Sequence, residues 1–232
     1  MKTSLRLGVI AATSVAAIAI AGPALAEEAK VSETAYILNS FSFLVHGVLV
    51  MLMAAGFAML EAGMVRTKNV ATICLKNISL YSVAGIMFYV VGYQLMYDGV
   101  DGGFMGSLSM WSGDDAAALK GDYDTLAYSA SSDWFFQMVF VATAASIVSG
   151  TIAERIRLWP FLAFVVVLTA IIYPIEGAWQ WGGGWLAEMG FADFAGSTIV
   201  HSTGGWAALM GAIILGARKG KYSKTGAVQP IP

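Results

Sequence analysis

The sequence predicts an all-α, polytopic membrane protein with five transmembrane helices. The chain is 58% hydrophobic and only 12% charged, with a mean hydropathy of +0.71, whereas ordinary globular domains carry about 25% charged residues. The charged residues are also spaced so that five long uncharged stretches remain between them. A helix rises about 1.5 Å per residue, so about 20 residues cross a hydrocarbon core about 30 Å thick. Each stretch is long enough for one crossing.

The N-terminus, residues 1–26, has the pattern of a secretory signal peptide. Lys2 and Arg6 precede an apolar stretch and the small-x-small sequence A-L-A, which ends at Ala26. A basic region, an apolar region and a small-residue cleavage site are the three parts of such a signal. The alternative is an uncleaved first span, which the cleavage sequence argues against. We expect the mature protein to begin at Glu27, outside the cytoplasm, in the inner (plasma) membrane of a bacterium.

The membrane spans of the mature chain, 27–232, are placed by the uncharged stretches. The five predicted spans cover approximately residues 34–60, 77–97, 134–153, 158–178 and 194–217.

Basic residues give the orientation of these spans. They gather in the first and third connections and after the last span, as Arg66, Lys68, Lys76, Arg155, Arg157, Arg218, Lys219, Lys221 and Lys224. The other connections and the mature N-terminus hold only Lys30 and Lys120. Because basic connections stay in the cytoplasm, we expect a cytoplasmic tail over 218–232 and an external N-terminus.

The second connection, residues 98–133, is predicted to be an acidic external loop with structure of its own. It is rich in aspartate and glycine and contains only Lys120 as a basic residue. A negatively charged surface at the outer ends of the spans raises the local concentration of cations. A merely solvated loop explains the same composition equally well.

Small residues predict close packing of two spans. Gly204, Ala208 and Ala212 form one ridge of small residues at helical spacing, and Ser146 and Gly150 form another. Such ridges let helix backbones approach closely in a membrane.

The single cysteine, Cys74, rules out a disulfide framework and a cysteine-based metal site within one chain, and its apolar neighbours predict a packed thiol. We expect no metal and no cofactor.

Four residues could handle a small cation. Phe136 and Phe140 lie four residues apart, on one face of the third span, and Trp181 lies near the same membrane face. Aromatic faces attract cations, and His201 is the only titratable group of the fifth span. Each residue has a plainer interpretation: packing for the phenylalanines, an interfacial position for Trp181, and a hydrogen bond to a neighbouring helix for His201.

The acidic residues near span ends have mainly structural interpretations. Asp193 precedes the fifth span and is expected to cap that helix or to hold the loop, rather than to bind a cation. Glu61 and Glu154 lie at span ends with arginine nearby in the sequence, which predicts ion pairs. His46 has no second feature to pair with and is interpreted as structural.

Several segments resemble the ammonium transporter family, which includes methylammonium permeases and Rh proteins. The segments are G-F-A-M-L-E-A-G-M-V-R-T-K-N, F-Q-M-V-F, I-V-S-G-T-I-A-E-R-I-R, W-G-G-G-W-L and D-F-A-G-S-T-I-V-H, in that order over nearly the whole mature chain. The resemblance implies a homotrimer. Each subunit would have eleven spans, arranged as two inverted five-helix halves and a last helix, around its own pore.

The resemblance also implies roles for the residues named above. Phe140 resembles the outer gate and recruitment phenylalanine, and Phe136 lines the same vestibule. Trp181 resembles the recruitment tryptophan, and Asp193 resembles the acidic residue that holds the vestibule loop. His201 resembles the first of two pore histidines. The implied substrate is ammonium or ammonia, with methylammonium as its analogue, moving through an apolar pore lined by histidine.

This sequence departs from the family pattern because it contains only the first inverted repeat. A second pore histidine, a second gate phenylalanine and a vestibule serine are not present. We expect either a truncated sequence or a half-transporter, and we expect the chain by itself not to conduct ammonium.

The leading function is ammonium transport in nitrogen uptake, and the alternative is an ammonium sensor on the same scaffold. An enzyme is not expected, since no paired aspartates and no nucleophile–base pair occur within the spans. The resemblance leaves open a P-II-type regulatory protein on the cytoplasmic face, and we expect no nucleic-acid partner.

Overall fold

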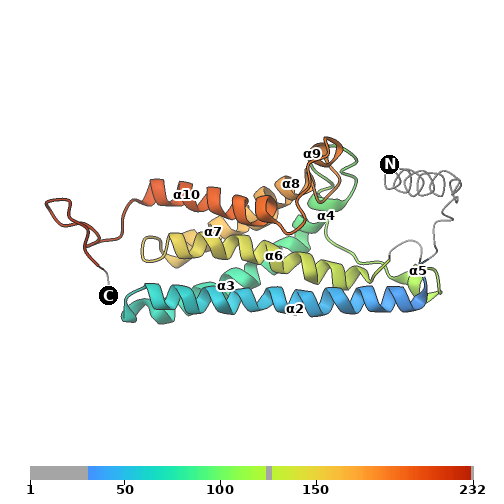
Figure 1. Ribbon diagram of the computed structural model, residues 1–232, viewed down its shortest axis with the longest axis horizontal. Coiled ribbons are helices and arrows are strands. Elements are labelled where there is room, and N and C mark those ends of the chain that lie inside the picture. Colours follow the sequence, from blue (N-terminus) through green and yellow to red (C-terminus); the bar gives the residue numbers. More distant parts are fainter. Residues whose placement is uncertain (1–30, 124–126, 231–232) are drawn as a thin grey trace, which may run out of the picture.

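The computed structural model describes residues 31–123 and 127–230, and this part of the chain is helical, without strands (Figure 1). The predicted signal peptide, 1–26, and the predicted start at Glu27 lie outside the described residues. Five helices are long and apolar enough to cross a membrane: Glu33–Met64, Thr67–Tyr97, Ala130–Thr151, Leu158–Ala178 and Ser197–Leu215. The prediction of an all-α chain with five transmembrane helices is confirmed.

Three of the five spans are composite. The first and third are the single helices α2 (Glu33–Met64) and α6 (Ala130–Thr151). The second is built from η1 (Thr67–Asn69), α3 (Val70–Met87), the π-helix η2 (Phe88–Gly92) and α4 (Tyr93–Tyr97). The fourth is built from α7 (Leu158–Val167), the π-helix η3 (Leu168–Ile172) and α8 (Tyr173–Ala178). The fifth is the π-helix η4 (Ser197–Ser202) continued by α10 (Thr203–Leu215), while α5 (Ala116–Leu119) and α9 (Trp185–Glu188) lie in loops.

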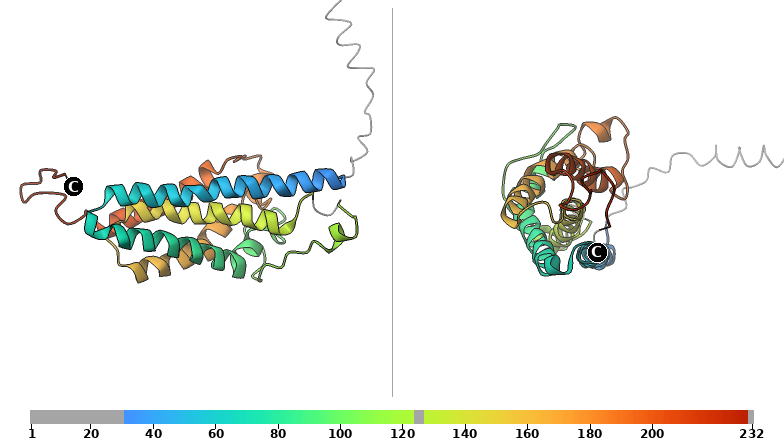
Figure 2. Two further views of the ribbon diagram at one scale, coloured as in Figure 1. Left: turned by 90° about the horizontal axis from the view of Figure 1, so that it is seen from below. Right: turned by 90° about the vertical axis from the view of Figure 1, so that its left-hand side faces the viewer.

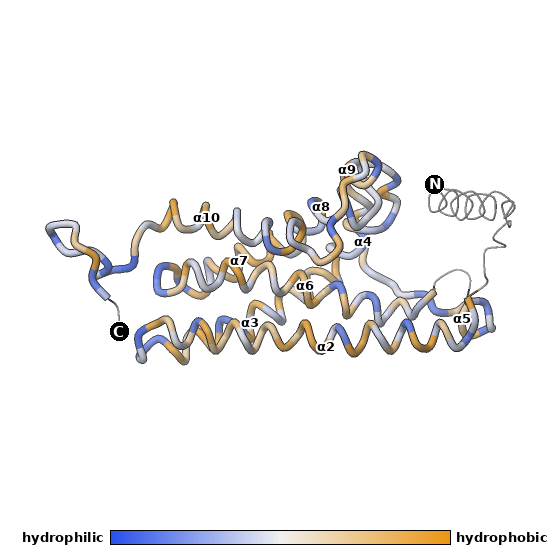
Figure 3. The backbone as a smooth tube through the Cα atoms, viewed as in Figure 1, coloured by the Kyte–Doolittle hydropathy of each residue, from blue (hydrophilic) through white to orange (hydrophobic). Residues whose placement is uncertain are grey.

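Polar residues gather at the two ends of the bundle, and apolar residues fill the spans between them (Figure 3). We call one end, which carries residues 98–129 and 179–196, the loop end. The opposite end carries residues 65–69, 152–157 and 216–230 and is called the basic end, after its lysines and arginines. Successive spans run antiparallel between these ends (Figure 1).

Helix α6 is the centre of the bundle. It packs against α2, α3 and α10, and an end-on view shows the other spans arranged around it (Figure 2). Two buried apolar clusters run along α6, one around Val141 and Ala144 and the other around Ala145 and Val148. Most of α2 is exposed instead, as expected for a helix in contact with lipid or with further chain.

The second span begins earlier than the sequence predicted, because Lys76 lies inside α3 and is only 4% exposed. Its Nζ lies 3.1 Å from Oε2 of Glu61 and donates to the Ser149 carbonyl at 2.8 Å. The predicted arginine partner of Glu61 was therefore wrong, since the partner is Lys76. Placing span boundaries at charged residues fails here because a buried charge is tolerated once it is paired and hydrogen-bonded.

Glu154 joins three segments at the basic end, and its predicted pairing with arginine is confirmed. Its Oε2 lies 3.2 Å from Nη1 of Arg66 and 3.5 Å from Nη1 of Arg218, and its Oε1 accepts from Asn69. Burial acts to raise the pKa of Glu154. The hydrogen bonds from Arg66, Asn69 and Arg218, together with the charge of Arg66, outweigh burial and hold the pKa below the ordinary 4.5.

The acidic loop is ordered by contacts to the bundle, and its predicted end is wrong. Asp115 accepts hydrogen bonds from the Tyr36 hydroxyl at 3.1 Å and from the Ala130 backbone at 2.9 Å. The last predicted loop residues, 130–133, already form the first turn of α6. Their polar side chains, Ser132 and Asp133, suggested a loop although both residues are buried.

Cys74 is exposed rather than packed, which corrects the prediction for that thiol.

The two π-helices, η2 and η3, pack against each other where the second and fourth spans meet. Pro174 follows η3 in the first turn of α8 and has no N–H to donate, and such a gap in a helix is commonly accommodated by a wider turn. Gly92 allows the close approach, because a Cβ at this position would lie 3.0 Å from the Thr169 carbonyl oxygen. These turns bring α4 and α8 together at the loop end.

The predicted small-residue ridge packs α10 onto α6. Gly204 and Ala208 are buried, and a Cβ on Gly204 would lie 2.9 Å from the Ala144 carbonyl oxygen. At the neighbouring Gly205, no atom of the described chain lies within 4 Å of the same Cβ position. The two adjacent glycines therefore differ in their surroundings, because Gly204 faces α6 and Gly205 points away from the rest of the described bundle.

We predict that Gly204→Ala destabilises the protein and that Gly205→Ala does not. Both changes raise helix propensity by up to about 1 kcal/mol, but only the first forces α10 away from α6, at a cost of about 1–3 kcal/mol. Thermal unfolding of the purified protein in detergent measures both. Equal melting temperatures for the two variants would contradict the packing described here.

Candidate functional site

Three of the predicted site residues meet in one cavity at the loop end. Phe136, Phe140 and Trp181 line a cavity of about 490 Å³. The rings of Phe136 and Phe140 are perpendicular, with centroids 5.1 Å apart, and the Phe140 and Trp181 centroids lie 5.9 Å apart. Since α6 supplies the phenylalanines and the segment after α8 supplies Trp181, only the folded bundle brings the rings together. Their role in binding stays a prediction.

Asp193 organises the wall of this cavity. Its two carboxylate oxygens accept hydrogen bonds of 2.8–3.0 Å from four successive backbone N–H groups, those of residues 196–199. Its backbone carbonyl accepts from the Trp181 indole N–H at 2.6 Å. The prediction that Asp193 caps the fifth span is confirmed. Asp193 is 6% exposed and does not line the cavity itself.

The start of the fifth span is shaped by a glycine next to this carboxylate. Gly196 has φ +85°, a left-handed conformation that side chains other than glycine adopt at a cost. A Cβ there would also lie 2.6 Å from Val200 Cγ2 and 3.2 Å from Trp181 Cη2. Gly196 thus lets the chain turn from Asp193 directly into η4 while Trp181 packs against the turn.

His201 lies in η4 but does not line the aromatic cavity. Its side chain is exposed on the described chain, on a span whose other residues carry no charge. The structure therefore separates His201 from the three aromatic residues, and its predicted role in a pore remains a prediction. His46, the other histidine, is exposed too, and its Nδ1 lies 2.8 Å from the Ser42 carbonyl oxygen of its own helix. That contact agrees with a structural role.

The sequence analysis missed several residues that line the cavity. These residues are Tyr93, Tyr97, Tyr128, Asp133, Gln137 and Phe194. A periodic signal was present for two of them, because Asp133 and Gln137 share a helical face with Phe136 and Phe140 at spacings of three and four residues. The tyrosines carried no comparable signal, since they come from other segments.

Tyr128 keeps its proton at neutral pH. Burial, followed by the nearby Asp133 carboxylate, raises the pKa of this hydroxyl above the ordinary value of 10.0. The Asp133 carboxylate itself accepts a hydrogen bond from the Tyr93 hydroxyl at 2.5 Å. The cavity therefore combines aromatic faces with one acidic group. Among the described residues, no group of three or more His, Cys, Asp or Glu side chains could hold a metal ion.

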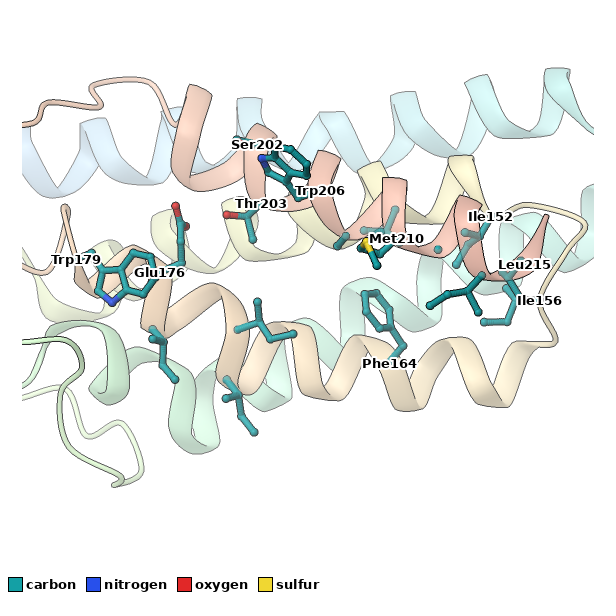
Figure 4. Close-up of a pocket in the computed structure, with 17 residues that line it drawn as sticks. Ile152, Ile156, Phe164, Glu176, Trp179, Ser202, Thr203, Trp206, Met210 and Leu215 are labelled. Carbon is teal, nitrogen blue, oxygen red and sulfur yellow. The ribbon is translucent and has the colours of Figure 1, made fainter. Parts of the chain in front are cut away.

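A second cavity, of about 800 Å³, lies between α10 and the fourth span (Figure 4). Its walls are almost entirely apolar and include Phe164, Trp206 and Met210. Glu176 and Thr203 face each other near one end (Figure 4). A groove of this composition suits hydrocarbon or another helix, and it contains none of the predicted site residues.

Comparisons with known proteins agree on one family. The sequence model described as "Ammonium Transporter Family" matches residues 41–231. The ammonium transporter Amt2 of Archaeoglobus fulgidus is 44% identical over 199 residues, which cover 82% of this chain and 41% of that protein. This chain therefore spans less than half the length of that relative.

Two solved structures have the same fold. A structure described as a sensor Amt protein is 38% identical with a TM-score of 0.74, and the match covers 85% of this chain and 49% of that one. Mep2 of Candida albicans is 26% identical with a TM-score of 0.68, and the match covers 84% and 42% of the two chains.

The Asp193 cap gives a prediction about pH. Burial acts to raise the pKa of Asp193, but the backbone N–H groups, that of Ile199 first, outweigh it and hold the pKa below the ordinary 3.8. A carboxyl whose pKa is lowered by folding stabilises the fold fully above its unfolded pKa and loses that effect as the pH falls through its folded pKa. We therefore expect Asp193→Asn to lower the melting temperature at neutral pH.

The difference in melting temperature between the wild type and Asp193→Asn should shrink as the pH falls below about 3.8, the ordinary value. Melting curves in detergent at pH 7, 5 and roughly 3 measure this difference, and the other carboxyl groups are common to both proteins. A difference that stays constant over this range would show that the charge of Asp193 contributes nothing.

Proposed function

Because this chain belongs to the ammonium transporter family, we propose that it binds ammonium in the aromatic cavity of the loop end and takes part in moving it across a membrane. Its relatives are transporters and not enzymes. The observation that carries the proposal is the grouping of Phe136, Phe140 and Trp181 around one cavity. Aromatic faces bind cations, and the attraction grows where water is excluded.

The proposed route starts at Trp181 and Phe140 and continues past the Phe136–Phe140 pair toward His201. Phe140, the residue that resembles the outer gate, would narrow this route, and Phe136 packs against it with ring centroids 5.1 Å apart. His201 is an exposed titratable group on an apolar span, a position typical of ion paths in membrane proteins. We propose that further helices cover His201 and complete the pore.

The chain spans less than half the length of the relative described above, so we propose that these five helices bind ammonium but do not conduct it unaided. Two features support binding of ammonium without its conduction. The binding cavity is formed within the chain, whereas His201 and the groove beside Glu176 remain open on its surface.

We further propose that the loop end is external and the basic end cytoplasmic, in the inner membrane of a bacterium. Arg66, Arg155 and Arg218 lie at the basic end, in keeping with the positive-inside rule. The exposed apolar face of α2 suits contacts with lipid or with the other subunits of a homotrimer. A P-II-type regulatory protein would approach the basic end.

A second candidate is ammonium sensing. It is favoured by the similarity to a solved structure described as a sensor Amt protein. A sensor needs the same binding cavity, so binding alone does not separate the two functions. Ammonium flux through a pore completed by further helices does, because a sensor binds its ligand without carrying it across the membrane.

The binding proposal predicts that Phe140→Ala and Trp181→Leu each weaken methylammonium binding several-fold. One cation–π contact contributes about 0.5–2 kcal/mol. Calorimetric titration of the purified chain in detergent with methylammonium chloride measures the affinity.

Phe41→Ala and Trp159→Leu are matched controls, because these residues are 63% and 78% exposed and lie outside the cavity. Binding unchanged in all four variants would remove the basis of the proposed function.

The conduction proposal predicts no ammonium flux above that of empty vesicles when proteoliposomes contain only this chain. His201 would then face lipid or a foreign partner, and a pore open to hydrocarbon does not hold water. An internal pH indicator reports the flux. Robust flux that disappears in His201→Ala would mean that these five helices suffice.

A further inference from the structure

Asp133 is a buried carboxylate that has no cationic partner among the described residues. It is 6% exposed. Among the described residues, the carboxylates that form ion pairs are those of Glu61 and Glu154. The Tyr93 hydroxyl donates to Oδ2 of Asp133 at 2.5 Å, and the Gln137 amide approaches Oδ1 at 3.4 Å. Such a charge is costly to bury unless it is paired and hydrogen-bonded.

These contacts leave part of the carboxylate unused. An ionised carboxylate has about four acceptor positions, and the Tyr93 hydroxyl and the Gln137 amide occupy two. The first turn of α6 stabilises a negative charge at this position, which helps to explain why the group is tolerated. Asp133 is one of the residues that line the cavity, so its remaining acceptor positions are open to a ligand there.

Aromatic rings surround the same space on several sides. Tyr93 and Tyr97, one turn apart on α4, have ring centroids separated by 5.0 Å. The buried Tyr97 hydroxyl has no hydrogen-bond partner among residues 31–123 and 127–230. Tyr128 lies before α6, and Trp181 forms a wall that comes from the segment after α8. A carboxylate among aromatic rings is the arrangement that suits a small organic or ammonium cation.

We propose that Asp133 is the counter-ion of the cation bound in this cavity, so that ammonium and primary alkylammonium ions bind in their charged form. The inference rests on the proposed function, since it assigns a further ligand to the same cavity. Ammonium and methylammonium both keep N–H groups that can donate to the free carboxylate positions. The cavity of about 490 Å³ greatly exceeds the roughly 30 Å³ that one water molecule occupies, so a methyl group fits beside the ammonium centre.

A purely structural role for Asp133 makes a different prediction. If the carboxylate only holds Tyr93 in place, Tyr93→Phe removes that hydrogen bond and should weaken binding at least as much as Asp133→Asn, whose amide oxygen can still accept it. If the carboxylate faces the cation, Tyr93→Phe keeps the charge and frees one more acceptor position. The pair of variants therefore separates a ligand from a positioning residue.

The experiment is calorimetric titration of the purified chain in detergent with methylammonium chloride at constant ionic strength. We expect Asp133→Asn to weaken binding by about tenfold or more, as is typical for loss of a hydrogen-bonded charge. Tyr93→Phe, which keeps both the aromatic ring and the carboxylate charge, should weaken binding clearly less than Asp133→Asn does. Asp114→Asn, the matched control, removes one carboxylate that is exposed in the loop outside the cavity.

Circular dichroism and gel filtration establish that each variant is folded. Asp133→Ser replaces Asp133→Asn if the asparagine variant is not folded. Unchanged affinity in Asp133→Asn, with weakened binding in Phe140→Ala and Trp181→Leu, overturns this inference and leaves the proposed function standing. A loss in Tyr93→Phe at least as large as that in Asp133→Asn also overturns it. No methylammonium binding to the wild type would overturn the proposed function and this inference with it.

Discussion

The candidate site depends on one carboxylate that holds a stretch of backbone in place. The first turn of a helix has no intrahelical acceptors for its N–H groups, and Asp193 accepts from four of them in succession. Its backbone carbonyl also accepts the indole N–H of Trp181. One residue thus fixes both the start of the fifth span and the wall of the aromatic cavity. The position of His201 on that span follows from the same anchor.

The buried carboxylates of the bundle are of two kinds, those with a cationic partner and one without. Glu61 is paired with Lys76 and Glu154 with two arginines, so each of these carboxylates has a cationic partner. At the loop end, Asp133 is bonded to a tyrosine and a glutamine and has no cationic partner within the described part of the chain. An unpaired buried carboxylate reduces stability, because its desolvation is not offset by an opposite charge. The proposed role of Asp133 as a counter-ion would offset this cost when a cation is bound in the aromatic cavity.

The sequence by itself determined the class of the protein and most of its spans. A bilayer requires long uncharged helices, so composition and charge spacing located all five. The fourth span ends where it was predicted, at Ala178. Local chemistry was readable for Asp193, because a helix start needs an acceptor, and for Gly204, because helices in membranes pack through small residues.

Only the tertiary structure decided which groups lie together. Lys76 was assigned to a connection because a sequence gives the cost of burying a charge but not the partner, Glu61, that offsets it. Asp133 was assigned to a loop for the same reason. Tyr93 and Tyr97 enter the cavity because the fourth span, wound through η3, packs beside α4, and this crossing is set by contacts far apart in the chain. Helix periodicity acts within a few residues, whereas the cavity is closed by segments that meet only when the bundle has formed.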